Sequence, residues 1–137
     1  MRRVAGNVRF CFALLILIAL SRGAGAEPGD AARGERAFQF CFSCHSVNPA
    51  EKANLQGPNL YRIIGRPAAA VPGFDYSDAM KERGAKGLVW EPATLDSYLA
   101  DPESVVPGTR MSVPPLRDAQ DRADLIAYLA RSGNFRP

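Results

Sequence analysis

The stretch Cys41-Phe42-Ser43-Cys44-His45 carries the strongest structural signal in this 137-residue chain. It holds two thiols separated by two residues, and an imidazole directly after the second thiol. In a helical turn, such spacing brings both sulfurs to one edge of a flat ligand and lets the imidazole reach beneath it. Cys-x-x-Cys-His is the attachment motif of c-type haem, in which the histidine nitrogen binds iron. The motif therefore predicts one covalently bound haem c, with its iron, per chain.

Three other uses of the cysteines compete with this interpretation. A structural zinc site takes four Cys or His ligands, but beyond residue 26 the chain offers only Cys41, Cys44 and a single histidine. A thioredoxin-like dithiol belongs to a βαβ unit, and the sequence predicts no strand. A disulfide between such close cysteines would close a very small loop and add little stability. The histidine that follows favours haem over all three.

The first 26 residues are expected to be an export signal and not part of the fold. Three arginines precede an apolar run of 11 residues, from Phe10 to Leu20, and an Ala-x-Ala cleavage pattern ends at residue 26. The run is shorter than the roughly 17–25 residues that a membrane span needs. We therefore expect a cleavable signal peptide over residues 1–26, one domain over residues 27–137, and a periplasmic location. An uncleaved N-terminal membrane anchor is the alternative.

Removal of this segment changes the charge balance. Four of the 17 Lys and Arg residues, and none of the 14 Asp and Glu residues, lie in residues 1–26. The rest of the chain has 13 basic and 14 acidic residues, and so a net charge of −1. Nucleic-acid binding needs a concentrated basic surface, so no nucleic-acid partner is expected.

The hydrophobic pattern predicts an all-α domain of about five short helices joined by long loops, because no segment alternates long enough to form a strand. Long ordered loops over residues 67–76 and 102–116 need something to fold around, and a large flat cofactor meets that need. The helices are expected from Asp30 to about Cys41, over Asn59–Ile64, from Ser77 to about Arg83, from Pro92 to just before Pro102, and from Asp118 to near Gly133.

The haem iron has a second axial position, and Met111 is the candidate to fill it. Met111 lies in a loop that Pro107 and Pro114 restrict, whereas Met80 lies on a predicted helix and is expected to pack in the core. An iron whose two axial positions are both filled by side chains transfers electrons. An iron with one open position can bind or activate small molecules.

The combination of motifs resembles the class I cytochromes c, a family of small electron carriers. The resemblance covers nearly all of residues 29–132 and implies the cytochrome c fold, with helices and loops wrapped around one haem. Besides the haem motif, the shared stretches are Gly57-Pro58-Asn59-Leu60, Gly65-Arg66, Pro72-Gly73-Phe74-x-Tyr76-Ser77-x-Ala79, Gly87-x-x-Trp90, Leu95-x-x-Tyr98-Leu99, Pro107-Gly108-Thr109-Arg110-Met111 and Asp124-Leu125-Ile126-Ala127-Tyr128-Leu129.

The resemblance implies a role for five residues at the iron and the thioethers. Cys41 and Cys44 would hold the haem by thioether bonds. His45 and Met111 would be the two axial ligands of the iron. The carbonyl of Pro58 would accept a hydrogen bond from the second nitrogen of His45, which fixes the ring and raises its basicity as a ligand.

Four further residues would surround the haem. Arg66, Tyr76 and Trp90 would supply donors to the two propionates, and Tyr98 would lie near the Met111 sulfur. On spacing alone, Trp90 and Tyr98 fit ordinary core aromatics better than haem contacts. The co-occurrence of the motifs is what favours the haem-binding interpretation.

The chain also departs from the animal-type members of the family. Met80 stands where they have an asparagine, and residues 112–115 lack the Phe and Gly found there. Lysines are few, so the lysine-rich docking face of the animal-type carriers is absent, and Arg110 is the main candidate for a positive contact.

The resemblance implies a periplasmic single-electron carrier and not an enzyme. It would dock transiently with redox proteins, such as membrane respiratory or photosynthetic complexes or periplasmic reductases. We expect a monomer with no stable membrane insertion after signal cleavage. Two alternatives remain open: a dedicated haem subunit of one periplasmic oxidoreductase, which a large exposed apolar patch would favour, and a ligand-binding or peroxidase-like haem protein if Met111 is displaced.

Overall fold

A computed structural model describes residues 27–51 and 55–132, and within them the fold is helical. The only β-type pairing in these residues is an isolated bridge between Pro67 and Val89. The predicted all-α class with about five short helices is confirmed. Residues 1–26, for which a signal peptide is predicted, and Gly133 lie outside the described residues. The helices are α1 (Ala31–Ala37), the 3₁₀-helix η1 (Phe38–Phe40), α2 (Asp78–Ala85), α3 (Pro92–Ala100), α4 (Pro102–Val105) and α5 (Ala119–Ser132).

Most helix starts coincide with the capping residues that the sequence indicates. The side chains of Asp30, Ser77 and Asp118 accept backbone N–H bonds from the first turns of α1, α2 and α5. These bonds satisfy donors that have no partner within the helix. Pro92 occupies the first turn of α3, where its missing N–H costs nothing.

The helix expected over Asn59–Ile64 is not formed, and that prediction is wrong. Arg62 has φ of 55°, a left-handed conformation that interrupts a right-handed helix. The guanidinium of Arg66 donates to the carbonyl of Asn59 at 2.7 Å and also to the carbonyl of Tyr61. The segment forms turns instead, and the Arg66 side chain bonds across them.

Helix α4 lies within a segment expected to have little regular structure. Pro102 was expected only to end the preceding helix, but it also occupies the first turn of α4. Asp101 caps this helix, since its Oδ1 accepts the Ser104 N–H at 3.3 Å. Asp101 is therefore the single residue between α3 and α4, and Pro102 begins the second of them.

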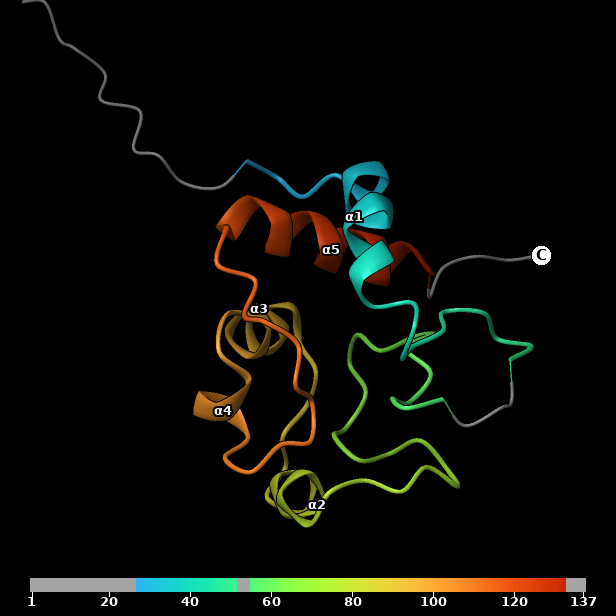
Figure 1. Cartoon of the computed structure of the whole chain (residues 1–137), viewed down its shortest axis with the longest axis vertical. Helices are drawn as coiled ribbons and strands as arrows, with labels where there is room; N and C mark the ends of the chain where they lie inside the picture. The colour runs from blue at the N-terminus through green and yellow to red at the C-terminus, as the bar shows by residue number, and fades with distance from the viewer. Residues whose placement is uncertain (1–26, 52–54, 133–137) are drawn as a thin grey trace, which may run out of the picture.

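Helices α1 and α5 cross closely at one end of the molecule (Figure 1). A methyl group placed on Gly34 of α1 would lie 1.9 Å from the carbonyl oxygen of Asp124 in α5, so only glycine fits at this crossing. Next to it, the rings of Phe38 and Tyr128 pack with their centroids 5.4 Å apart. The crossing joins the two ends of the described chain.

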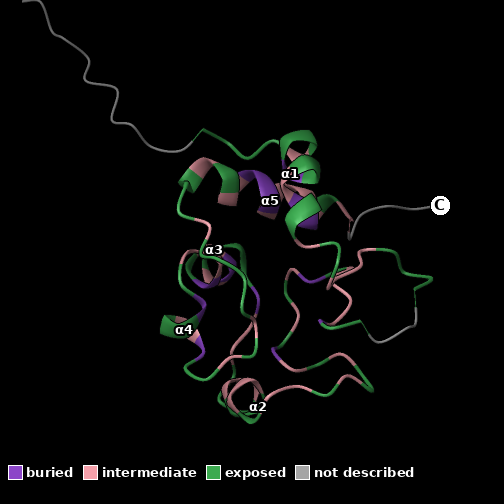
Figure 2. Cartoon of the chain, in the orientation of Figure 1, coloured by how far each residue is buried: buried purple, intermediate pink, exposed green. Residues whose placement is uncertain are grey.

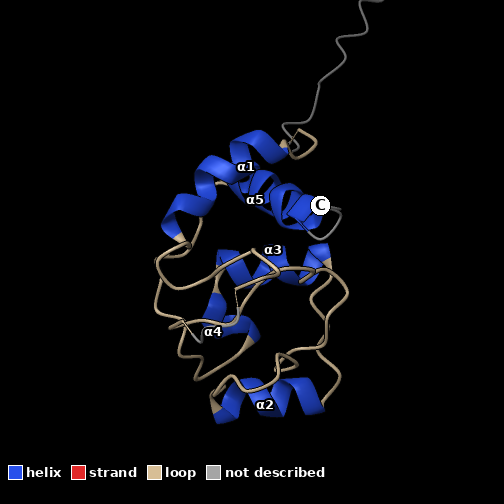
Figure 3. Ribbon diagram, turned by 90° about the vertical axis from the view of Figure 1, so that its right-hand side faces the viewer, coloured by secondary structure: helices blue, strands red, loops and turns tan. Residues whose placement is uncertain are grey.

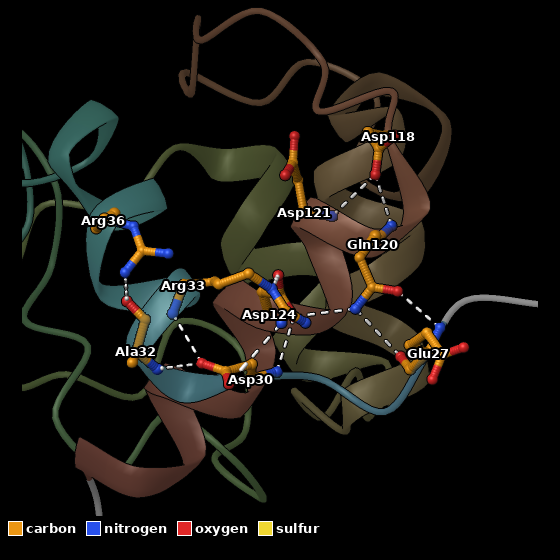
Figure 4. A network of polar contacts seen from close by, with 9 residues as sticks. All are labelled: Glu27, Asp30, Ala32, Arg33, Arg36, Asp118, Gln120, Asp121 and Asp124. Carbon is orange, nitrogen blue, oxygen red and sulfur yellow. Dashed lines mark hydrogen bonds and ion pairs between the residues drawn. The ribbon is translucent and has the colours of Figure 1, made fainter.

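A buried carboxylate strengthens the same crossing (Figure 4). Asp124 receives the Arg33 Nε at 2.5 Å and Nη2 at 2.8 Å, the Asp30 N–H at 2.7 Å and the Gln120 Nε2 at 3.0 Å. The bond from Arg33 is the main reason that the pKa of Asp124 lies far below its usual range, and it outweighs the opposing effect of burial. Gln120 in turn accepts the Glu27 N–H at 2.6 Å.

Helix α2 lies at the end of the molecule opposite α1 and α5, with α3 between them (Figures 1 and 3). The most buried residues lie on α5, on α3 and in the inner parts of the loops (Figure 2). None of the helices in residues 27–51 and 55–132 combines the length and the apolar content that a bilayer span requires.

Candidate cofactor site

The two cysteines and the histidine lie in one turn that continues directly from η1. The N–H of Cys41 donates to the Phe38 carbonyl at 2.8 Å, and the N–H groups of Cys44 and His45 donate to the Cys41 carbonyl at 3.1 and 2.9 Å. Both cysteines are free thiols whose residues line the same cavity. Burial, and to a smaller extent Cys44, raises the pKa of the Cys41 thiol.

The imidazole of His45 is held in one orientation. Its Nδ1 lies 2.8 Å from the carbonyl oxygen of Pro58, which can only accept, so Nδ1 carries the proton and donates. Burial lowers the pKa of His45, and the bond to Pro58 opposes this shift only in part. The ring is therefore neutral near pH 7, and its Nε2 lone pair is available to a metal.

Gly57 makes room for this ring. A methyl group at Gly57 would lie 2.2 Å from Cε1 of His45, and Gly57 donates its N–H to the carbonyl of Cys44 at 2.8 Å. The glycine thus fixes the loop carrying Pro58 against the turn carrying His45. Any side chain at position 57 would displace the imidazole or the loop.

Met111 is positioned through its backbone. Its N–H donates to the hydroxyl oxygen of Thr109 at 3.3 Å, and the same oxygen lies 2.8 Å from the hydroxyl of Tyr98 on α3. Further along the loop, the N–H of Leu116 donates to the carbonyl of Leu99, also on α3, at 2.8 Å. The Met111 loop is therefore attached to α3 on both sides of the methionine.

Arg66 brings a positive charge to the cavity. Its guanidinium is half-buried and binds backbone carbonyls, and the ion pairs of the described residues do not include it. Burial lowers the pKa of Arg66, and nearby Tyr76 partly offsets that shift. A guanidinium stays protonated under these conditions, so this part of the cavity suits an anionic group.

The other two residues expected at the propionates, Trp90 and Tyr76, lie in the same region as Arg66. The backbone of Trp90 is paired with that of Arg66, because its N–H donates to the Arg66 carbonyl at 2.9 Å. The ring of Trp90 is almost fully buried and packs 4.9 Å from the ring of Tyr98. The Tyr76 hydroxyl accepts the N–H of Val71 at 3.2 Å, and burial raises the pKa of Tyr76.

The structure brings all nine expected site residues to one cavity of about 470 Å³. Met80, which was expected to be core packing alone, also lines it from α2. The Tyr98 hydroxyl bonds to Thr109, which carries the Met111 N–H, so Tyr98 acts on the methionine loop through its neighbour. The nine are Cys41, Cys44, His45, Pro58, Arg66, Tyr76, Trp90, Tyr98 and Met111.

A haem fits this set of residues. The side chains available to it are two thiols, one neutral imidazole, one thioether and the Arg66 guanidinium, which bonds to backbone carbonyls and is in none of the ion pairs of the described residues. No group of three or more His, Cys, Asp and Glu side chains able to hold a bare metal ion occurs in the described part of the chain. Seven of the nine buried apolar residues line the cavity, so the core is built around it: Phe38, Ile63, Trp90, Leu95, Tyr98, Leu125 and Leu129.

Comparison with known proteins agrees with this fit. A family model for cytochrome c matches residues 31–132. The chain belongs to the cytochrome c family. It is 49% identical over 102 residues to cytochrome c2 of Rhodomicrobium vannielii, which covers 74% of this chain and 78% of that protein. It is 48% identical to cytochrome c type-1 of Ascaris suum over 74% of this chain and 87% of that one.

Solved structures of cytochromes show the same fold. Cytochrome c2 from Rhodospirillum centenum matches with a TM-score of 0.70 and 38% identity, over 75% of this chain and 98% of that one. Cytochrome cH from Methylobacterium extorquens matches with a TM-score of 0.67 and 41% identity, over 75% and 99%. The protein is thus a haem protein of an electron-carrier family, and its cofactor is a covalently bound haem c.

Two residues that shape the site were not recognised as such from the sequence. Gly57 and Thr109 both lie in the motifs shared with other cytochromes c, but their contacts depend on the fold. The hydroxyl two residues before Met111 was a usable signal, because threonine side chains often accept a nearby backbone N–H. Nothing local to Gly57 indicates that an imidazole will pack against it.

Proposed function

We propose that this cytochrome c is a single-electron carrier in which Cys41 and Cys44 would hold the haem by thioether bonds and His45 and Met111 would bind its iron. The supporting observation is that His45, with Nδ1 committed to Pro58, lines the same largely apolar cavity as Met111. When bound, haem supplies one-electron chemistry, as its iron alternates between the ferrous and ferric states.

The chain's own residues would control that chemistry. Pro58 and Gly57 keep the His45 ring oriented, and Thr109 holds the backbone beside Met111. Fixed ligands change little between oxidation states, so little rearrangement accompanies each transfer. The buried apolar walls exclude water, which favours the less charged ferrous state and raises the reduction potential. Arg66 provides a positive charge for a carboxylate of the cofactor.

The location and the partners belong to the same proposal. The N-terminal pattern that ends at residue 26 and the bacterial cytochrome c2 relatives support export to the periplasm. There the protein would shuttle electrons between membrane respiratory or photosynthetic complexes, or to periplasmic reductases, by brief docking through a small interface. It would act as a carrier and not as an enzyme.

The first prediction concerns the axial ligand. In protein exported from a bacterial host, Met111→Ala should remove the weak red absorption band of methionine–iron ligation and let the ferrous form bind carbon monoxide. The reduction potential should fall by on the order of 100 mV, because axial ligands set haem potentials over a range of about 0.8 V. Absorption spectra and redox titration measure these effects, and the intact mass shows whether the chain begins at Glu27.

Met80→Ala is the matched control, since Met80 is the other methionine that lines the cavity. This variant should keep the band and exclude carbon monoxide. If Met80→Ala loses the band while Met111→Ala keeps it, the ligand assignment is wrong. If the unmodified ferrous protein itself binds carbon monoxide, the ligand-binding or peroxidase-like alternative replaces the carrier.

A further inference from the structure

Two phenylalanines beside the attachment cysteines point into solvent. Phe40 has 80% and Phe42 has 58% of its surface exposed, whereas Phe38, two residues earlier, is 6% exposed. The other large exposed apolar residues of the described chain are Leu55 and Val113, and both also line the cavity. Exposed apolar side chains gathered beside a functional site mark an interaction surface.

Contacts on the attachment turn hold several of these side chains in one region. Phe42 lies between the two attachment cysteines, and the Gly57 N–H, next to Gln56, donates to the Cys44 carbonyl at 2.8 Å. Leu55 is the chain neighbour of Gln56 and is exposed at the edge of the cavity. Phe40, Phe42 and Leu55 are called the apolar rim below.

The segments that carry this rim, residues 37–50 and 53–61, contain no Asp, Glu, Lys or Arg. The same is true of residues 111–116, which include the exposed Val113 at the cavity. Arg110, the expected positive contact, bonds to the Asp75 carboxylate at 3.4 Å and also to the Asp75 carbonyl, so its charge is largely offset. A charged partner surface placed on the rim would lose hydration without gaining an ion pair. The complementary surface is therefore apolar and uncharged.

We propose that the apolar rim is the docking surface for the redox partner, and that the partner's contacting face is itself apolar and uncharged. The inference rests on the proposed carrier function. Electron transfer requires the partner to approach the cofactor closely, and the rim lies on the turn whose cysteines bind the cofactor. In each encounter one electron passes between the proteins, so one is oxidised and the other reduced, while no covalent bond forms or breaks.

The test measures how fast respiratory membranes of the source organism oxidise the reduced holoprotein. Each second-order rate is divided by the rate with hexacyanoferrate(III), a small oxidant that needs no docking surface. The ratio for Phe40→Ser/Phe42→Ser should fall about tenfold, as for loss of an aromatic interface anchor. Phe40→Leu/Phe42→Leu should keep most of the rate, because it keeps the surface apolar. Arg110→Gln, the charge control, should change the ratio less than about twofold.

A second measurement uses only the unmodified protein. Between about 20 and 200 mM ionic strength, its rate with the membranes should change less than about twofold, because screening acts only on charges. A steep fall of this rate with salt, or a larger effect of Arg110→Gln than of the serine double variant, would overturn the proposal that the rim is the docking surface. A holoprotein that transfers no electron even to hexacyanoferrate(III) would instead contradict the carrier function itself.

Binding of the apolar rim to a second copy of this chain, or to a lipid surface, would give results that differ from those of a redox partner. Sedimentation that shows dimers of the unmodified protein, and monomers of the serine double variant, would assign the rim to a second copy of this chain. Binding to phosphatidylethanolamine–phosphatidylglycerol vesicles that the same variant abolishes would assign it to a lipid surface. Either result would overturn the proposal, whereas monomers that ignore the vesicles agree with it.

Discussion

At the scale of single residues, Asp124 shows how a charge can be kept inside a small domain. It is 2% exposed and is the one charged residue among the described residues that is buried to this extent. Its carboxylate bonds to the Arg33 guanidinium, the Asp30 N–H and the Gln120 amide, so both oxygens have donors. Hydrogen bonds to both carboxylate oxygens offset the free-energy cost of removing a charge from water.

The resulting prediction concerns pH. The native pKa of Asp124 is depressed, so its contribution to stability is complete above the unfolded value near 3.8 and is lost as pH falls through the lower native value. Asp124→Asn should lower the melting temperature by roughly 5–10 °C at pH 7. The difference from the unmodified protein should shrink as the pH falls below about 4. Thermal unfolding followed by circular dichroism measures both effects.

Glu35→Gln is the control for this experiment, since Glu35 pairs with Arg131 at 3.2 Å between the same two helices but on the surface. An exposed pair contributes little, so this variant should melt within about 2 °C of the unmodified protein. If the two variants melt at equal temperatures at pH 7, the buried hydrogen bonds of Asp124 contribute no more to stability than the exposed ion pair of Glu35.

At the scale of secondary-structure elements, the loop around Met111 depends on α3. Thr109 links the Met111 N–H to the Tyr98 hydroxyl, and burial raises the pKa of Tyr98, so that hydroxyl remains protonated and can donate. The loop beyond it is exposed from Ser112 to Pro115. Thr109 is therefore the side chain that links the backbone of Met111 to α3, next to the contacts of Arg110 with Asp75.

Loss of that anchor should loosen the loop. Thr109→Val has nearly the same shape but removes both hydrogen bonds, each with a net value of about 1 kcal/mol. We expect binding of external imidazole to the ferric protein, which requires Met111 to move away, to strengthen at least about fivefold. Thr109→Ser keeps the hydroxyl and should restore weak binding. Equal imidazole affinity in all three proteins would show that Thr109 does not hold the loop.

Elements with local signals could be predicted from the sequence, and elements set by distant contacts could not. Asp30, Ser77 and Asp118 mark helix starts because a capping bond forms within three residues. The segment 59–64 has an acceptable helical pattern, but the Arg66 guanidinium takes its carbonyls, and no local signal shows this. A proline at position 102 predicts the end of the preceding helix, but the same residue also suits the first turn of a new one.

At the scale of the whole molecule, most of the buried apolar core lines the cavity that would hold the cofactor. The haem motif and the family resemblance predicted which residues meet, and the structure places all nine at one cavity. The way in which Arg66, Gly57 and Thr109 are held could not be predicted, because backbone carbonyls and loop contacts do not appear in a sequence pattern. The residues that line the cavity could be predicted from the sequence, whereas most of the hydrogen bonds that hold them in place could not.

A chain without its cofactor should not keep this fold. Seven of the nine buried apolar residues line the cavity, so without the cofactor their side chains would face water instead of the haem, and a small domain has little stability to spare for that loss of apolar burial. Cys41→Ser/Cys44→Ser, which cannot form the thioethers, should lose near-ultraviolet circular dichroism and cooperative thermal unfolding when isolated without haem. A sharp unfolding transition in this variant would show that the protein alone supports the core.

The crossing of α1 and α5 also has a consequence for the order of assembly. Arg33 and Asp124 stand 91 positions apart, so a chain that emerges N-terminus first from a ribosome or a translocation pore exposes the cysteines long before α5 is available. Until α5 has been made, Arg33 has no Asp124 to bind and the cavity lacks Leu125 and Leu129 from its wall. Both thiols are therefore in place before the cavity that receives the cofactor is complete.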